Sequence, residues 1–246
     1  MKKLNFYLIA LLATITTTFQ SCDNYDDGYS LGDIAVDWAT VDVKGAHTYS
    51  FVGDTWGSLW PAASSIPWYN PVDGQRVIAV FNPLADDFQG YDCAIKVEGV
   101  KEVLTKGVED LTAENDKEFG NDPVTILQGN MWIGGGYLNV VFAQDIPQSK
   151  KHRVSLVKPE NSLFNEDGNY IHLEYRYNTY NDTTGYWVNG AVSFNLNSLK
   201  ITPQTKGIKV KLNSSKNGEV VVTFDLKNEP LPEAVKKMDF SEMEIR

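Results

Sequence analysis

The sequence predicts an all-β protein in two parts, a small barrel or sheet followed by an antiparallel β-sandwich. Three observations predict this fold class. Apolar and polar residues alternate with a period of two along most of the chain, aromatic and β-branched residues are frequent in those segments, and clusters rich in Gly, Pro, Asn and Asp separate them. With 246 residues, the chain is long enough for one large or two small domains with real hydrophobic cores.

The first 21 residues are predicted to be a lipoprotein signal peptide. Met1-Lys2-Lys3 is a positive flank, and residues 4–19 are mostly apolar but end in threonines, which is typical of a secretory signal and poor for a permanent membrane span. Residues 19–22 (FQSC) have the order of a lipobox, a bulky apolar residue three positions before a cysteine and a small one just before it. We expect cleavage before Cys22 and a stable anchor of several acyl chains on its thiol. The alternative is an ordinary secretory signal that ends near a cysteine.

The charge and the cysteines narrow the class of protein further. The predicted mature chain would carry a net charge of −12, because the signal peptide takes two lysines from a chain of net charge −10. This acidity disfavours nucleic acids and anionic lipid surfaces as partners. Besides Cys22 the sequence has only Cys93, so a disulfide framework is not expected. Cys93 alternates with Ile95 and Val97 on one face of a strand, which indicates a buried thiol rather than a nucleophile.

The predicted first domain spans residues 33–115 and follows an acidic tether, residues 22–32, which has too few apolar residues to order by itself. Five segments of the domain have strand character: 34–38, 48–51, 76–81, 91–97 and 100–105. Residues 54–75 contain three prolines and are predicted to form a long loop. Loops of this length are usually functional, or else they contain an unrecognised element.

The charged, apolar-poor stretch 109–122 is the predicted boundary region, and the second domain is placed at residues 116–246. Part of this stretch, residues 111–119, could form one or two helical turns. Seven further segments have strand character: 123–132, 136–143, 152–158, 170–178, 185–195, 207–212 and 219–226. Seven short strands separated by turns favour an antiparallel sandwich. The strongest local prediction is a hairpin at residues 216–219 (KNGE).

Several of these segments together resemble the NigD-like lipoproteins. They are residues 22–32 (CDNYDDGYSLG), the strand around Trp38, residues 74–77 (GQRV) and the tyrosine-rich residues 172–177 (HLEYRY). The resemblance covers nearly the whole predicted mature chain. It implies an N-terminal OB-like β-barrel, a C-terminal β-sandwich and a role in bacteriocin immunity, which was proposed for the founding member. It brings no catalytic residues, so the only site that it transfers is the lipid attachment at Cys22.

The sequence contains no recognisable catalytic or metal-binding motif, and we expect a non-enzymatic protein without a cofactor or metal. The three histidines, His47, His152 and His172, are too scattered to indicate a metal site. Residues 134–136 (GGG) lack the Lys-Ser/Thr and the helix of a phosphate loop and are predicted to form a flexible turn. The paired carboxylates of a glycoside hydrolase stay open as an alternative, because a sequence does not show their separation in space.

Four aromatic residues of the predicted loop are the candidates for contact with a ligand or partner: Trp56, Trp60, Trp68 and Tyr69. Such rings can stack on a sugar or anchor a protein partner. The alternative, which we favour for this loop, is that the rings fold inward and close the barrel mouth. A second aromatic set lies on the predicted strands 170–178 and 185–195. It is expected to pack across strands, with Tyr175 and Tyr177 on one face.

These observations predict a lipid-anchored protein of the cell envelope, most simply of the outer membrane. The acidic residues after the anchor, Asp23, Asp26 and Asp27, resemble a signal for surface exposure and equally fit a solvated linker. The first functional hypothesis is binding of a protein partner. The alternative is a glycan-binding accessory lipoprotein that uses the four aromatic residues. The sequence indicates no oligomeric state.

Overall fold

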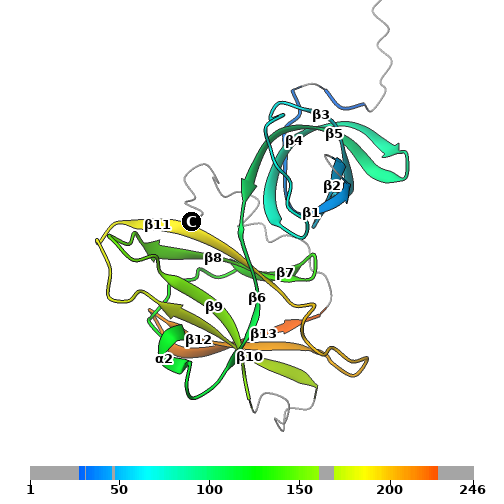
Figure 1. Ribbon diagram of the computed structural model, residues 1–246. Coiled ribbons are helices and arrows are strands. Elements are labelled where there is room, and N and C mark those ends of the chain that lie inside the picture. The colour runs from blue at the N-terminus through cyan, green and yellow to red at the C-terminus, as the bar shows by residue number, and fades with distance from the viewer. Residues whose placement is uncertain (1–27, 31, 46–47, 161–168, 227–246) are drawn as a thin grey trace, which may run out of the picture.

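The structure is a computed structural model that describes residues 28–30, 32–45, 48–160 and 169–226. The predicted signal peptide, the lipidation site Cys22 and most of the predicted tether lie outside these residues. The described chain forms a β-barrel and a larger β-sandwich. The chain passes directly from the last barrel strand, β5 (Tyr91–Glu102), into the first sandwich strand, β6 (Leu104–Leu111) (Figure 1). This arrangement confirms the predicted fold class. No helix in the described ranges has the length and apolar character needed to cross a membrane.

The barrel closes through five strands of the described chain, in the order β1-β2-β3-β5-β4. The strands are β1 (Ala35–Gly45), β2 (Thr48–Gly53), β3 (Gly57–Ser64), β4 (Arg76–Phe88) and β5 (Tyr91–Glu102). β1 pairs with two strands along its length: its first half pairs with β4 and its second half pairs with β2. Alternate side chains point inward and form an apolar core around Val41, Phe51 and Ile95.

β3 corrects the prediction for residues 54–75, which form a strand and a shorter loop instead of one long loop. Trp60 and Pro61 lie within β3, and the register against β5 shifts between Pro61 and Ala63. Proline removes a donor from the ladder and alanine has little preference for strands, so this segment lacks the alternation that marks the other strands. The same feature hid the parallel pairing of β3 with β5.

The sandwich is built from eight described strands in the order β13-β12-β10-β9-β6-β11-β8-β7. The strands are β6 (Leu104–Leu111), β7 (Met131–Gly134), β8 (Tyr137–Asp145), β9 (Arg153–Pro159), β10 (Tyr170–Asn178), β11 (Trp187–Asn195), β12 (Gly207–Ser214) and β13 (Gly218–Asp225). Val124 bridges to Ser214 of β12 and Thr125 bridges to Ala143 of β8. These bridges connect distant parts of the sheet, which folds over one apolar core.

β6 departs from the predicted antiparallel pattern. It enters directly from the barrel, lies between β9 and β11 and runs parallel to both, and β10 is also parallel to β12. The other four pairs of the described sheet are antiparallel. Apolar alternation marks a strand and does not give its direction, so this difference was not visible in the sequence. Because β6 belongs to the sheet, the chain leaves the barrel at Val103, before the predicted division at residue 115.

Several local predictions are confirmed. β12 and β13 form the predicted hairpin, and Gly218 at its turn has the positive φ angle that glycine tolerates. Tyr175 and Tyr177 share the buried face of β10. Cys93 is a buried free thiol on β5. The short helix α2 (Asp116–Phe119) lies within the predicted segment and buries Phe119.

A third apolar cluster joins the barrel to the sandwich. It consists of Trp38, Ile78, Val103, Trp132, Val141 and Ala191. Trp38 and Ile78 come from the barrel strands β1 and β4, and the last three residues come from the sandwich. The rings of Trp38 and Trp132 meet edge to face, with centroids 4.9 Å apart. The two domains are therefore joined by buried apolar contacts as well as by the chain connection.

A buried ion pair lies beside this cluster. The guanidinium of Arg76 donates to both carboxylate oxygens of Asp54, at 2.9 and 2.6 Å, and to Oδ1 of Asn139 in β8 at 3.3 Å. The side chains of Arg76 and Asp54 are 0% and 2% exposed. The turn between β7 and β8 packs on this pair, and a Cβ atom on its Gly135 would lie 2.7 Å from Oδ1 of Asp54. Residues 134–136 therefore form a tight turn whose missing side chains let the sandwich approach the ion pair.

Candidate functional site

A groove opens at one end of the barrel, and we call it the barrel groove. Its volume is about 590 Å³. Three parts of the chain line it: the ends of β1 and β2, the last residues of β3, and the loop that follows β3. The lining residues are Val43, Gly45, Tyr49, Pro61, Ala62, Ala63, Ser64, Ile66, Pro67, Tyr69, Asn70 and Pro71. Apolar and aromatic side chains predominate, with a few polar groups, as is common for binding sites.

The barrel groove exists because β2 and β3 separate at this end of the barrel. The two strands pair only as far as Phe51 and Leu59. Beyond Leu59, β3 continues to Ser64 in contact with β5 alone, and residues 48–50 of β2 pair with β1 alone. In the described chain, the facing edges of residues 48–50 and 60–64 are therefore not paired with each other. The groove lies between them.

The walls of the barrel groove include an aromatic pair. The ring of Tyr69 packs on Tyr49, with centroids 5.7 Å apart, and both rings cover the end of the barrel core. Burial raises the pKa of both phenols, and the charge of Glu102 adds to the effect on Tyr69. Both phenols are therefore neutral hydrogen-bond donors at physiological pH. The hydroxyl of Tyr69 is buried and has no hydrogen-bond partner among the described residues.

Two of the four predicted contact residues lie at the barrel groove. Tyr69 lines it, and the neighbouring Trp68, on the same loop, is 78% exposed. The indole of Trp68 is therefore accessible to a ligand or partner. Trp68 is exposed, as expected for a ring that contacts a ligand or partner. Tyr69 folds inward, as expected for a ring that closes the barrel mouth.

The other two predicted residues lie elsewhere on the barrel. Trp56 closes the opposite end of the barrel core, where its ring meets Phe81 edge to face at 5.4 Å. Trp60 packs on Tyr91, with ring centroids 5.1 Å apart. The ring contacts of the four residues in the described chain are with other partners and not with each other. The structure therefore does not bring the four rings together as one stacking platform.

Residues 74–76, which the sequence did not suggest as a functional group, connect the barrel groove to the domain contact. The chain passes from the groove loop into Gly74, whose carbonyl accepts a hydrogen bond from the Tyr137 hydroxyl at 3.0 Å. The side-chain amide of Gln75 donates to the carbonyl of Val103 at 2.6 Å, and Arg76 forms the buried ion pair. The segment GQRV, which contributed to the family resemblance, is thus the strip on which the sandwich packs.

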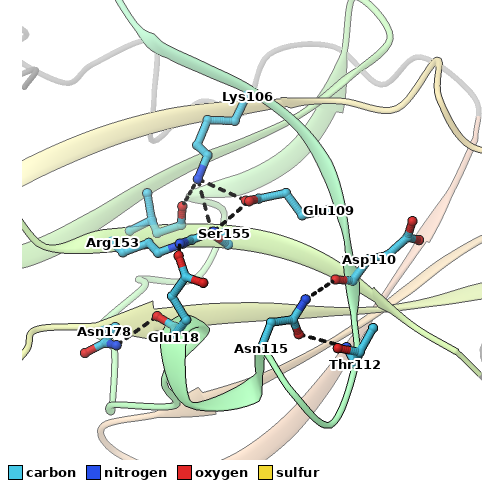
Figure 2. Close-up of polar contacts among 10 residues, drawn as sticks. Lys106, Glu109, Asp110, Thr112, Asn115, Glu118, Arg153, Ser155 and Asn178 are labelled. Atoms are coloured by element: carbon cyan, nitrogen blue, oxygen red, sulfur yellow. Dashed lines mark hydrogen bonds and ion pairs between the residues drawn. The ribbon is translucent and has the colours of Figure 1, made fainter.

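A charged cluster on the outer face of the sandwich was a second candidate for a site (Figure 2). Arg153 of β9 forms ion pairs with Glu109 of β6 and Glu118 of α2, and its guanidinium lies 4.4 Å from the centre of the Phe119 ring. Lys106 pairs with Glu109 at 3.1 Å. Each of these charges has a partner within the cluster, so its evident role is to hold α2 on the sheet. No group of His, Cys, Asp or Glu that could hold a metal ion is found in the described ranges.

A second hollow lies in the sandwich, between residues 125–131 and the β12–β13 hairpin, with a volume of about 480 Å³. Ile126, Met131 and Val220 line it and also cover the sandwich core. Leu127 at its rim is exposed. The barrel groove is the better candidate of the two, because it combines an aromatic wall, an unpartnered hydroxyl and separated strand edges.

Two family models match the chain and divide it at the same place as the structure. The NigD-like N-terminal OB domain matches residues 38–103, and the NigD-like C-terminal beta sandwich domain matches residues 107–226. A comparison of the sequence with curated proteins found no match.

Three solved structures have a fold similar to that of this chain. A protein described as toxin-related from Parabacteroides distasonis is 33% identical, with a TM-score of 0.70 over 84% of this chain and 100% of that one. A NigD-like immunity protein from Bacteroides caccae is 15% identical, with a TM-score of 0.57 over 81% and 100%. A protein described as a lipoprotein from Bacteroides fragilis is 9% identical, with a TM-score of 0.52 over 79% and 98%. The last two likenesses show the fold alone. The two domain matches, which together cover most of the chain, place it in the NigD-like family.

Proposed function

We propose that the protein is a non-enzymatic lipoprotein of the cell envelope, anchored in the outer membrane through Cys22, that binds a polypeptide partner in the barrel groove. The lipobox order at residues 19–22 supports the anchor. The structural neighbour described as a lipoprotein has the same two-domain fold. The neighbours described as toxin-related and as an immunity protein favour a protein toxin as the partner.

The separation of β2 and β3 is the observation that carries the choice of a polypeptide. An extended peptide can add to an unpaired strand edge, where main-chain hydrogen bonds give affinity and neighbouring pockets read alternate side chains. The edge of β3 is suitable because Ala62, Ala63 and Ser64 are small and exposed, so another backbone can approach closely. A glycan site would instead be expected to gather several exposed rings, and Trp68 is the single strongly exposed ring of the four candidates.

The test is affinity capture from envelope fractions with the full-length lipidated protein and two groove variants. Ala63→Glu places a charged side chain in the groove, and Trp68→Ala removes the exposed ring beside it. Trp187→Ala is the matched control, because Trp187 is also an exposed tryptophan, at 64%, but lies on the sandwich. Circular dichroism and thermal unfolding confirm that each variant is folded.

We expect the same partner to be recovered with the wild type and with Trp187→Ala, and to be lost with Ala63→Glu. Equal recovery by all four proteins would contradict the assignment of the groove. Binding of an oligosaccharide that is lost only with Trp68→Ala would establish the glycan alternative instead. The anchor is tested separately by the mass of the N-terminal peptide, which must carry acyl chains on Cys22.

A further inference from the structure

The first described residues are fixed to the end of the barrel that lies opposite the barrel groove. The phenol of Tyr29 donates a hydrogen bond to Oδ1 of Asp86 at 2.7 Å, and its ring lies 6.2 Å from that of Trp56. The hydrogen bond to Asp86 and burial raise the pKa of Tyr29 to about 12, so the phenol keeps its donor proton at physiological pH. The side-chain amide of Asn82 donates to the carbonyl of Asp33 at 2.7 Å, which is a second contact between this N-terminal segment and the barrel. We call this end of the barrel the tether end.

The course of two strands shows that the tether end and the barrel groove are opposite ends. Trp56 directly precedes β3 at the tether end, and the groove residue Ile66 follows the end of β3. β1 runs the same way. It starts at Ala35, which pairs with Phe81 beside Trp56, and it ends at Gly45 in the groove wall. The full length of the barrel therefore separates the two ends.

The short chain before Tyr29 limits how far the tether end can lie from a membrane. Tyr29 is only seven positions after Cys22. In any conformation this stretch spans at most about 24 Å, since an extended chain advances about 3.4 Å per residue. We propose that the tether end faces the membrane and that the barrel groove and the sandwich are held on the side away from it. This inference rests on the proposed anchor at Cys22.

Charge at the tether end indicates that the lipid, and not the barrel surface, makes the membrane contact. Asp33, Asp86, Asp87 and Asp92 lie on or beside the strands at this end, and anionic headgroups repel carboxylates. The orientation also defines the kind of partner that the groove can accept. It is a polypeptide that arrives from the aqueous phase, and not a segment embedded in the anchoring bilayer.

The test compares the labelling rates of two engineered cysteines on the lipidated protein in phospholipid vesicles. Ala85→Cys reports on the tether end of β4 and Asn70→Cys on the rim of the groove, and both positions are exposed. The reagent is a bulky polyethylene glycol maleimide, and the reference is the same variant with Cys22→Ser in solution. The buried Cys93 stays in place, and the parent protein without a new cysteine measures its background. A small maleimide controls for local exposure.

We expect the vesicle to slow bulky labelling of Ala85→Cys severalfold and to leave Asn70→Cys unchanged, while the small maleimide labels both at their solution rates. Adding Tyr29→Ala should free more of the chain before β1 and relieve the protection of Ala85→Cys. Equal rates at the two sites, or protection of Asn70→Cys alone, would overturn the orientation while leaving the anchor intact. Failure of the protein with native Cys22 to float with vesicles would instead remove the anchor itself. Loss of partner binding by the groove does not affect these readings, so the two proposals fail separately.

Discussion

At the scale of single residues, the most unusual group is the carboxylate of Asp37 inside the barrel. It is fully buried on β1, and its Oδ2 accepts the backbone N–H groups of Thr55 and Trp56 at 3.0 and 2.9 Å. Oδ1 is buried without a hydrogen-bond partner among the described residues. Burial raises the pKa of Asp37, and the nearby charge of Asp54 acts in the same direction. Asp37 therefore organises the turn after β2 while its own ionised form is disfavoured.

This raised pKa predicts a specific pH dependence of stability. Below the ordinary aspartate pKa, the carboxyl is protonated in both the folded and the unfolded state and contributes no pH dependence. Between the ordinary pKa and the raised pKa, the folded state holds more protons, so the free energy of unfolding falls as pH rises, by up to about 1.4 kcal/mol for each pH unit. Above the raised pKa the penalty is constant.

Asp37→Asn should remove this dependence. Urea unfolding at several pH values from 4 to 7 measures it, as the difference between the wild type and the variant. Asp42→Asn is the control for removal of a partly exposed carboxylate from the same strand. Parallel profiles for the wild type and Asp37→Asn would show that the buried carboxyl does not titrate differently on folding.

At the scale of elements, the turn between β7 and β8 shows how glycine residues allow two domains to pack closely. Gly135 has a φ angle of +60°, and a Cβ atom would also lie 2.8 Å from Nη1 of Arg76. Gly90, in the turn between β4 and β5, has a φ angle of +88° but nothing within 4 Å of its Cβ position. Both glycines therefore have a positive φ angle, but only Gly135 lies against other atoms that a side chain would meet.

Substitution of these two glycines should separate the two effects. Gly90→Ala should cost about 1–2 kcal/mol of stability, because an L-residue is strained in a left-handed conformation. Gly135→Ala should cost about 1–3 kcal/mol more, because its methyl group overpacks the Arg76–Asp54 pair. Chemical denaturation of the full-length protein measures both values. Equal losses would mean that the turn moves away from the ion pair without penalty.

The elements that the sequence predicted are those with strong alternation. β8 to β13 and the hairpin at Gly218 lie close to their predicted positions, and the paired burial of Tyr175 and Tyr177 follows from the same pattern. β3 was missed because Trp60-Pro61-Ala62-Ala63 has no alternation, and its strand geometry depends on β5. Strand direction in the sandwich also depends on distant partners. For example, β6 pairs with β11 far along the chain.

The candidate site could be predicted only in part, because it is a property of the closed barrel. The sequence drew attention to the segment that contains Trp68 and Tyr69, and both lie at the barrel groove. It could not separate them from Trp56, which lies at the opposite end of the barrel core beside Phe81. Neither the gap between β2 and β3 nor the buried contact of Arg76 with Asn139 leaves a local signal in the sequence. The gap arises because β3 continues along β5, and Arg76 and Asn139 are remote in sequence.

At the scale of the whole molecule, the barrel and the sandwich should unfold as one cooperative unit. The apolar cluster around Trp38 and Trp132 and the ion pair of Arg76 are both buried between them. Interfaces between domains within a chain are often polar and then permit relative motion. The continuous core here favours a fixed arrangement, which the proposed orientation on the membrane also requires.

Trp132→Ala tests this coupling. Loss of a buried tryptophan should cost about 3–5 kcal/mol, and here the loss falls on the contact between the domains. We expect the wild type to show a single calorimetric transition, and Trp132→Ala to show two transitions or one that is broad and no longer two-state. Trp187→Ala, at an exposed position of β11, should keep the single transition. A sharp single transition in Trp132→Ala would show that other contacts suffice to couple the domains.

The central position of β6 has a consequence for how the chain folds during its synthesis. Leu104, its first residue, pairs with Val192 of β11, which follows 88 residues later. The middle of the large sheet therefore cannot form until β11 has been synthesised. Until then β6 offers an open edge to any neighbouring polypeptide, and the cluster around Trp38 lacks Ala191 of β11. Nascent or truncated forms that stop before β11 should therefore depend on chaperones. Expression of either half alone, cut where the two family models meet, should yield aggregates.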